Sequence, residues 1–221
     1  MAVELPLFTL GTVLFPHMPL GLHIFEERYR TMLRDCEESG TTFGVIAIRE
    51  GTEVGRTAVP YDVGTLAMIR DKEQLDDGRY NLVVVGASRF RVDSLTYDRA
   101  YLVGSAHYLE DAPPSLDDGQ WAAPRASLVE SVISAFTRYL ATLAELSEPD
   151  AQDIELPDDP ELLAYIVSAA LRVEVSRRQE LLELDSTDAR LRGCLTLLRR
   201  ETSLLDRMLQ RRDLVATVSP N

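Results

Sequence analysis

Lysine is almost absent from this chain of 221 residues, and Lys72 is the only one among its 23 basic residues. A phosphate-binding loop needs a Gly-Lys pair to reach the phosphates. The chain contains no such pair, which excludes a P-loop ATPase. A serine–lysine peptidase needs a desolvated lysine as its base. We expect Lys72 to lie at the polar tip of a hairpin, solvated and charged, and we therefore predict no peptidase activity.

Cysteine and histidine are scarce as well. Cys36 and Cys194 stand far apart beside apolar residues in helical patterns, so we predict buried free thiols, as in a reducing cytosol, rather than a disulfide. The histidines, His17, His23 and His107, match no common zinc spacing. We expect no metal, no cofactor and no catalytic residue.

The charge is strongly of one sign, with a formal net charge of −13 and a pI of about 4.7. Nucleic acids are bound through basic faces, so this charge argues against a nucleic-acid partner. The acidity peaks at 145–161, which holds eight acidic residues and no basic one. Its composition favours a solvated linker over an acidic contact arm.

Long apolar runs are missing too. No stretch approaches the roughly 18 apolar residues of a membrane helix. Segment 5–15 is about as long as the apolar region of a signal peptide, but Glu4 precedes it and no basic residue does. No small-residue cleavage site follows. We expect a cytoplasmic protein with no membrane partner.

The first half of the chain has the pattern of a β-rich unit. Residues 25–39 have one apolar helical face followed by Gly40, and Asp77-Gly78 is typical of a hairpin turn. We expect Gly86-Ala87-Ser88 to break the strand that begins at Tyr80. Short strands separated by turns favour a barrel or a sandwich. The strands are expected at 43–48, 63–69, 80–85, 89–92 and 101–109.

Arg89 and Arg91 lie on one face of the strand expected at 89–92, because side chains alternate with period two. Two neighbouring guanidinium groups could clamp a carboxylate or a phosphate. The acidity of the chain instead favours ion pairs with nearby acids on an exposed sheet face.

The second half is helical by periodicity. Asp159-Pro160 is a helix start signal, and Ser176 to Gln179 matches a capping box. Further helices are expected around 128–143 and from Asp185 or Ser186 onward. We place a β-rich subdomain at 1–111, a linker at 112–119, a helical subdomain at 120–215 and a tail at 216–221.

The opening segment, 5–20, is apolar and contains three prolines. Proline fixes φ and lacks an N–H, so we expect short extended pieces joined by bends, and neither a long helix nor a central strand. We predict a peptide-binding groove between the barrel and the helices, although each residue could equally well close the barrel. The groove residues are Phe15, Pro16, Met18, Phe25 and Tyr29.

These features, in this order, resemble the N-terminal substrate-binding domain of Lon proteases. The resemblance is carried by Leu-Pro-Leu-Phe at 5–8, Val-Leu-Phe-Pro at 13–16, Phe-Glu-Glu-Arg-Tyr at 25–29, the Val-Gly-Ala-Ser-Arg-Phe stretch at 85–90 and the helical pattern at 178–191. It implies an α+β fold, with a PUA-like β pseudo-barrel followed by a helical subdomain. Lon enzymes continue into ATPase and peptidase domains, and this sequence ends at Asn221.

The resemblance implies a non-catalytic module that binds polypeptides. Its partners would be unfolded or flexible chains or a partner protein. Two alternatives stay open: a small-ligand or RNA-binding PUA-like module, and an enzyme of undescribed type. The sequence leaves the oligomeric state undetermined.

Overall fold

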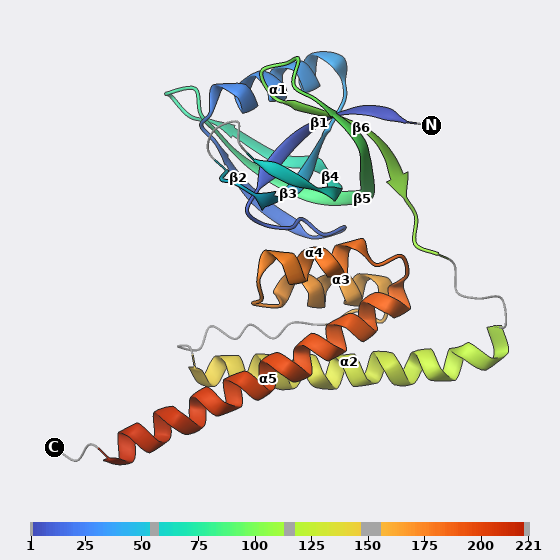
Figure 1. Cartoon of the computed structure of the whole chain (residues 1–221), viewed down its shortest axis with the longest axis vertical. Coiled ribbons are helices and arrows are strands. Elements are labelled where there is room, and N and C mark those ends of the chain that lie inside the picture. Colours follow the sequence, from blue (N-terminus) through green and yellow to red (C-terminus); the bar gives the residue numbers. More distant parts are fainter. Residues whose placement is uncertain (1, 54–57, 113–117, 147–155, 219–221) are drawn as a thin grey trace. The chain divides into compact units, whose positions relative to one another are not determined.

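The computed structural model describes residues 2–53, 58–112, 118–146 and 156–218, with backbone alone for 118–124 and 213–218. The centre of the expected linker, most of the acidic stretch and the end of the expected tail lie outside these ranges. The chain forms two compact units (Figure 1), Met1–Asp111 with Ser168–Glu183, and Ala112–Val167 with Leu184–Asn221. Segment 168–183, which we expected in the helical subdomain, is thus grouped with the first unit.

The first unit is built on a six-stranded sheet in the order β2-β5-β4-β3-β1-β6, and β5 also pairs with β6. This extra pairing closes β1, β3, β4, β5 and β6 into a ring and leaves β2 attached to β5 alone. Together with the five helices of the described residues, the arrangement confirms the α+β prediction. The strands are β1 (Val3–Leu10), β2 (Pro19–Ile24), β3 (Phe43–Glu50), β4 (Val59–Gln74), β5 (Tyr80–Thr96) and β6 (Leu102–Leu109).

Gly86 does not end β5, which continues from Tyr80 to Thr96, although its register with β4 shifts between Gly86 and Arg89. Our expectation that the strand ends here was wrong, and the structure gives another reason for the glycine. A Cβ atom at Gly86 would lie 2.1 Å from the carbonyl oxygen of Phe15. Position 86 therefore needs a glycine, because the backbone of the opening segment packs directly against β5 at this point.

The expectation that prolines keep the opening segment out of the interior of the sheet was also wrong. Strand β1 contains Pro6 and lies between β3 and β6. It pairs with β6 from Val3 to Leu7 and with β3 only from Leu7 onward. Pro6 is tolerated because the ladder on the β3 side starts after it, so no bond of that ladder needs its missing N–H.

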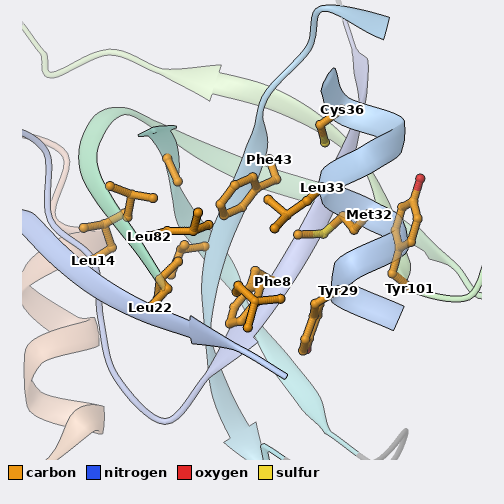
Figure 2. Packing of buried hydrophobic residues seen from close by; sticks show 14 of the residues in the cluster. Phe8, Leu14, Leu22, Tyr29, Met32, Leu33, Cys36, Phe43, Leu82 and Tyr101 are labelled. Atoms are coloured by element: carbon orange, nitrogen blue, oxygen red, sulfur yellow. The ribbon is translucent and has the colours of Figure 1, made fainter. Parts of the chain in front are cut away.

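Helix α1 (Glu27–Ser39) packs on the sheet and completes a core (Figure 2). Its buried residues are Tyr29, Met32, Leu33 and Cys36, as predicted, whereas Phe25, which we also placed on this face, precedes the helix and is exposed. The helix ends as expected at Gly40, which has a φ of 64° and donates its N–H to the carbonyls of Cys36 and Glu37. Cys36 and Cys194 are buried free thiols, as predicted.

Helix α4 (Val175–Glu183) also belongs to the first unit. It begins one residue before Ser176, and the N–H of Arg177 donates to the carbonyl of Glu174 at 3.0 Å, so Ser176 is not the capping residue that we expected. Gln179 is buried and donates from Nε2 to the carbonyl of Val63 on β4 at 2.9 Å. This bond joins α4 to the sheet.

Arg89 does not lie on an exposed sheet face, contrary to our expectation. It is only 3% exposed, forms an ion pair with Asp111 and donates to the carbonyl of Leu182 at 2.7 Å. At the C-terminal end of α4, the guanidinium of Arg89 donates to a carbonyl that has no partner within the helix. Its positive charge also interacts favourably with the negative end of the helix dipole. Arg91, on the other hand, is exposed. The two arginines therefore do not act as one clamp, because only Arg89 is buried.

The second unit is helical. Its long helices α2 (Asp118–Leu146) and α5 (Thr187–Val218) pack against each other, and α3 (Pro160–Ala170) crosses the boundary between the units. The buried guanidinium of Arg190 stacks 4.4 Å above the ring of Tyr165 and donates to the carbonyl of Leu184 at 2.8 Å. No helix in the described part of the chain is both long and apolar enough to cross a membrane.

Replacing Gly86 with alanine should destabilise the first unit by about 1–3 kcal/mol, because the new methyl group must displace a backbone carbonyl. Gly21→Ala is the matched control, since a Cβ there meets nothing within 4 Å. It should change the free energy of unfolding by no more than about 0.5 kcal/mol. Urea unfolding followed by circular dichroism measures both variants. Equal stabilities would contradict the tight contact at Gly86.

Replacing Arg89 with methionine should destabilise the fold by about 3–5 kcal/mol, since the carboxylate of Asp111 would lose its cation within a largely buried site. Arg91→Met changes an exposed arginine of the same strand and should be neutral within about 0.5 kcal/mol. Thermal unfolding of each variant gives its midpoint temperature, which is compared with that of the unchanged chain. If both melt like the unchanged chain, Arg89 does not hold α4 and Asp111 together.

Candidate functional site

The candidate site is a crevice in the first unit beside the start of α1. It lies where β1 separates from β6 beyond Leu7 and where β2 ends at Ile24. Its volume is about 60 Å³, several times the roughly 10–15 Å³ of cavity volume that one water molecule needs. The crevice therefore has room for one side chain and is far smaller than a typical ligand pocket. Its described lining residues are Phe8, Thr9, Leu10, His23, Phe25, Glu26, Tyr29 and Glu53.

Tyr29 forms the inner wall of this crevice. Its ring stacks on Phe8 with centroids 4.0 Å apart, and its hydroxyl lies 2.9 Å from Oγ1 of Thr9. The N–H of Thr9 donates to the same hydroxyl at 3.4 Å. Burial raises the pKa of Tyr29, so the phenol stays neutral and can bond Thr9. The hydroxyl of Tyr29 thus accepts the N–H of Thr9 at a point where β1 is no longer paired with β6.

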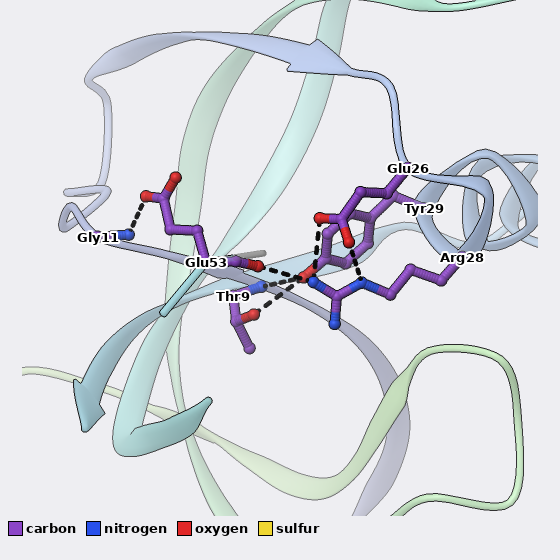
Figure 3. A network of polar contacts seen from close by, with 6 residues as sticks. All are labelled: Thr9, Gly11, Glu26, Arg28, Tyr29 and Glu53. Carbon is purple, nitrogen blue, oxygen red and sulfur yellow. Dashed lines mark hydrogen bonds and ion pairs between the residues drawn. The ribbon is translucent and has the colours of Figure 1, made fainter. Parts of the chain in front are cut away.

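Three segments are held together at the rim by a polar network (Figure 3). Arg28 binds the carboxylate of Glu26 through two bonds of 3.1 Å and donates to the carbonyl of Glu53 at 2.8 Å. The side chain of Glu53 accepts the N–H of Gly11. The guanidinium of Arg28 lies 4.3 Å from the centroid of the Tyr29 ring. The network connects the end of β1, the start of α1 and segment 51–53.

The outer wall carries the aromatic side chain that remains accessible. Phe25 is 49% exposed, and its ring stacks on His23 with centroids 6.1 Å apart. Nδ1 of His23 lies 2.8 Å from Oδ1 of Asn81, and Nε2 lies 3.2 Å from a guanidinium nitrogen of Arg79. Because a guanidinium only donates and an amide oxygen only accepts, these contacts fit the tautomer that donates from Nδ1 and accepts at Nε2.

The turn of the opening segment lies elsewhere in the first unit. Phe15 is fully buried and Pro16 is buried, whereas Met18 is half-buried. His17 has a φ of 66°, uncommon for a residue other than glycine. Its N–H donates to the carbonyl of Gly86 at 2.8 Å, and the N–H of Gly86 donates to the carbonyl of Met18 at 3.0 Å. His17 is therefore a turn residue.

The structure therefore brings together two of the five predicted groove residues, Phe25 and Tyr29, at one crevice. Phe15, Pro16 and Met18 are not among its described lining residues. Phe25 and Met18 have accessible side chains, whereas the other three are buried and support the surface from beneath.

Sequence reasoning missed the polar part of the site, above all Thr9, Arg28 and Glu53. The only local signal was the Arg28-Tyr29 pair at the start of a helix. Glu53 comes from a segment without periodicity, and its bond to Gly11 joins residues 42 positions apart. No local pattern predicts such a contact.

Lys72 is exposed, as we expected, but it lies within β4 and not at the tip of the hairpin. It forms an ion pair with Glu37 on α1 and lies 4.7 Å from the ring centroid of Tyr80. An exposed lysine paired with a carboxylate is the opposite of the desolvated lysine that a catalytic base requires.

The remaining reactive groups give no sign of chemistry. Burial raises the pKa of the Cys36 thiol, which disfavours the nucleophilic thiolate. Within the described ranges, no three His, Cys, Asp or Glu side chains are arranged to hold a metal ion.

Known proteins resemble this chain over most of its length. The Lon protease of Escherichia coli K12 is 26% identical over 206 residues, and that of Anaeromyxobacter dehalogenans is 27% identical over 203 residues. These alignments cover 92% and 91% of this chain. They cover only 25% and 24% of the two relatives, so the chain spans about a quarter of their length.

Solved structures agree. The crystal structure of a Lon N-terminal domain protein from Xanthomonas campestris superposes with a TM-score of 0.64 at 28% identity, covering 88% of this chain and 98% of that one. The N-terminal domain of a Mycobacterium avium complex Lon protease gives a TM-score of 0.62 at 17% identity, which shows the shared fold alone; 89% of this chain and 98% of that one are covered.

A family described as the ATP-dependent protease La (LON) substrate-binding domain matches residues 4–200. The match covers both units of the structure, from β1 into α5. The chain belongs to the Lon substrate-binding domain family.

Proposed function

We propose that this chain is a non-catalytic module that binds unfolded or flexible polypeptides in the cytoplasm. The observation that carries the proposal is membership of a substrate-binding domain family, together with accessible apolar side chains beside the crevice. Phe25 stands on the outer wall. Exposed aromatic side chains next to a buried framework are typical of binding surfaces.

Further apolar side chains are exposed on the neighbouring strands. Met68 on β4 is 45% exposed and Val83 on β5 is 42% exposed. Methionine adapts its shape to varied partners. A surface of this kind suits recognition of many apolar segments more than one defined ligand.

The alternative readings have less support. The crevice is far smaller than the roughly 300–1,000 Å³ of a typical small-ligand pocket, and a second hollow beside α1, of about 230 Å³, also lies below that range. An RNA ligand is opposed by the net charge of −13. An enzyme would need an activated acid, base or nucleophile, and the groups described above supply none.

Binding should be measurable with reduced, carboxamidomethylated lysozyme, a permanently unfolded and basic polypeptide, in the absence of nucleotide. Phe25→Ala should weaken its Kd about tenfold or more, because a large apolar contact is lost. Fluorescence anisotropy with labelled lysozyme gives the Kd values. Tyr108→Ala is the matched control: Tyr108 is 50% exposed on β6 and is not among the described residues lining the crevice.

The control variant should bind within about twofold of the unchanged chain. Equal weakening by both substitutions would argue against a site at the crevice. No measurable binding by the unchanged chain would contradict the polypeptide-binding proposal itself, and titration with labelled RNA would then test the alternative.

A further inference from the structure

Strand β2 is the end strand of the sheet and has an open edge. It pairs with β5 along all six of its residues, from Pro19 to Ile24, and with no other described strand. The remaining strands close into a ring, so the outer edge of β2 is not paired within that ring. An edge strand presents unpaired N–H and C=O groups in the geometry of an extended chain.

The register shows which backbone groups face outward. The N–H of Gly86 donates to the carbonyl of Met18, and hydrogen-bonded positions alternate along an antiparallel pair. Leu20, Leu22 and Ile24 therefore point their backbone groups toward β5. Pro19, Gly21 and His23 then point theirs away from the sheet. Pro19 fits this assignment, because proline in an edge strand occupies a position whose missing N–H would face solvent.

The usual protections of an edge are few in β2. Natural edges carry charged side chains, bulges or prolines. Strand β2 contains no Lys, Arg, Asp or Glu, and its register with β5 has no shift. A Cβ at Gly21 would meet nothing within 4 Å. Only Pro19 at one end interrupts the edge, and the N–H and C=O groups of Gly21 and His23 have no hydrogen-bond partner among the described residues.

The edge of β2 leads directly into the candidate crevice. His23, the last residue with outward backbone groups, lines the crevice together with Phe8, Leu10 and Phe25. A chain extended along β2 would bring one side chain to the crevice, and the volume of about 60 Å³ suits a single aliphatic group.

The rim of the crevice favours a cation. The carboxylate of Glu53 accepts the N–H of Gly11 and has no ion pair with any described residue. Glu53 is exposed, and the whole chain is acidic. A basic residue next to the aliphatic one would be attracted to this carboxylate.

We propose that β2 binds an extended polypeptide segment by strand addition, through the backbone of Gly21 and His23. The segment has alternating aliphatic and basic residues, and one aliphatic side chain enters the crevice beside Phe25. Main-chain hydrogen bonds then supply affinity with little dependence on sequence, and the crevice and Glu53 supply the selectivity. This inference rests on the proposed polypeptide-binding function and specifies how the segment is held.

The test compares Gly21→Pro with Gly21→Ala in the full chain. Both substitutions add atoms into open space, but only proline removes the outward N–H and blocks the edge. The probe is a short fluorescein-labelled peptide of alternating leucine and lysine. Its Kd should weaken about tenfold or more for Gly21→Pro and should stay within about twofold for Gly21→Ala. Circular dichroism establishes that each variant is folded.

The peptide provides a second measurement that does not depend on the folding of a variant. Alternate residues of an added strand direct their N–H groups toward the edge. N-methylation of every second residue should therefore abolish binding in one register and leave it nearly unchanged in the other. Loss in both registers or in neither would overturn strand addition.

The outcomes separate this inference from the proposed function. If unfolded lysozyme and the peptide bind equally well to the unchanged chain and to folded Gly21→Pro, polypeptide binding stands and the strand-addition inference fails. If neither probe binds the unchanged chain, the proposed function fails first. If the unchanged chain instead forms a dimer that Gly21→Pro abolishes, and the peptide does not bind, the edge serves a second copy of this chain and the inference is overturned.

Discussion

The approach of the Phe15 carbonyl to Gly86 is the contact on which the arrangement of the first unit depends. It occurs where β5 changes partners: residues before Gly86 pair with β2, and residues from Arg89 onward pair with β6. A side chain at this point would push the opening segment away. With the glycine in place, one uninterrupted strand closes the ring of the sheet and also carries β2 as an extra strand outside it.

This arrangement leaves two backbone edges beside the crevice, one on β1 and one on β2. The first is covered by side chains and the second is not covered by any described residue. Beyond Leu7, β1 loses β6 as a partner, and Tyr29 satisfies the Thr9 N–H while its ring covers Phe8. Arg28 holds Glu26 and segment 51–53 around it. The edge of β2 has no comparable cover among the described residues. The crevice between the two edges is thus rigid on one side and open on the other, which suits a docking site.

How much of the site follows from sequence can be judged residue by residue. The sequence placed Phe25 in the apolar helical face of 25–39, but the helix begins only at Glu27 and Phe25 precedes it with an exposed ring. The grouping with Phe15 was a weaker inference, since adjacency in an apolar run does not say which side chains point inward; Phe15 is fully buried, whereas Phe25 is half exposed. Arg89 shows the same limit, because period two places it with Arg91 although its true neighbours are Asp111 and Leu182.

The sequence by itself determined the helices and most strands, the helix end at Gly40, the lack of a P-loop and the family, because periodicity, capping and motifs are local properties. Only the tertiary structure decided that β5 passes through Gly86, that Pro6 lies inside the sheet, that α4 joins the first unit and that β2 keeps a free edge. These features depend on pairings between residues far apart in the chain. Such pairings are settled by which carbonyls, guanidinium groups and side chains fit together in space.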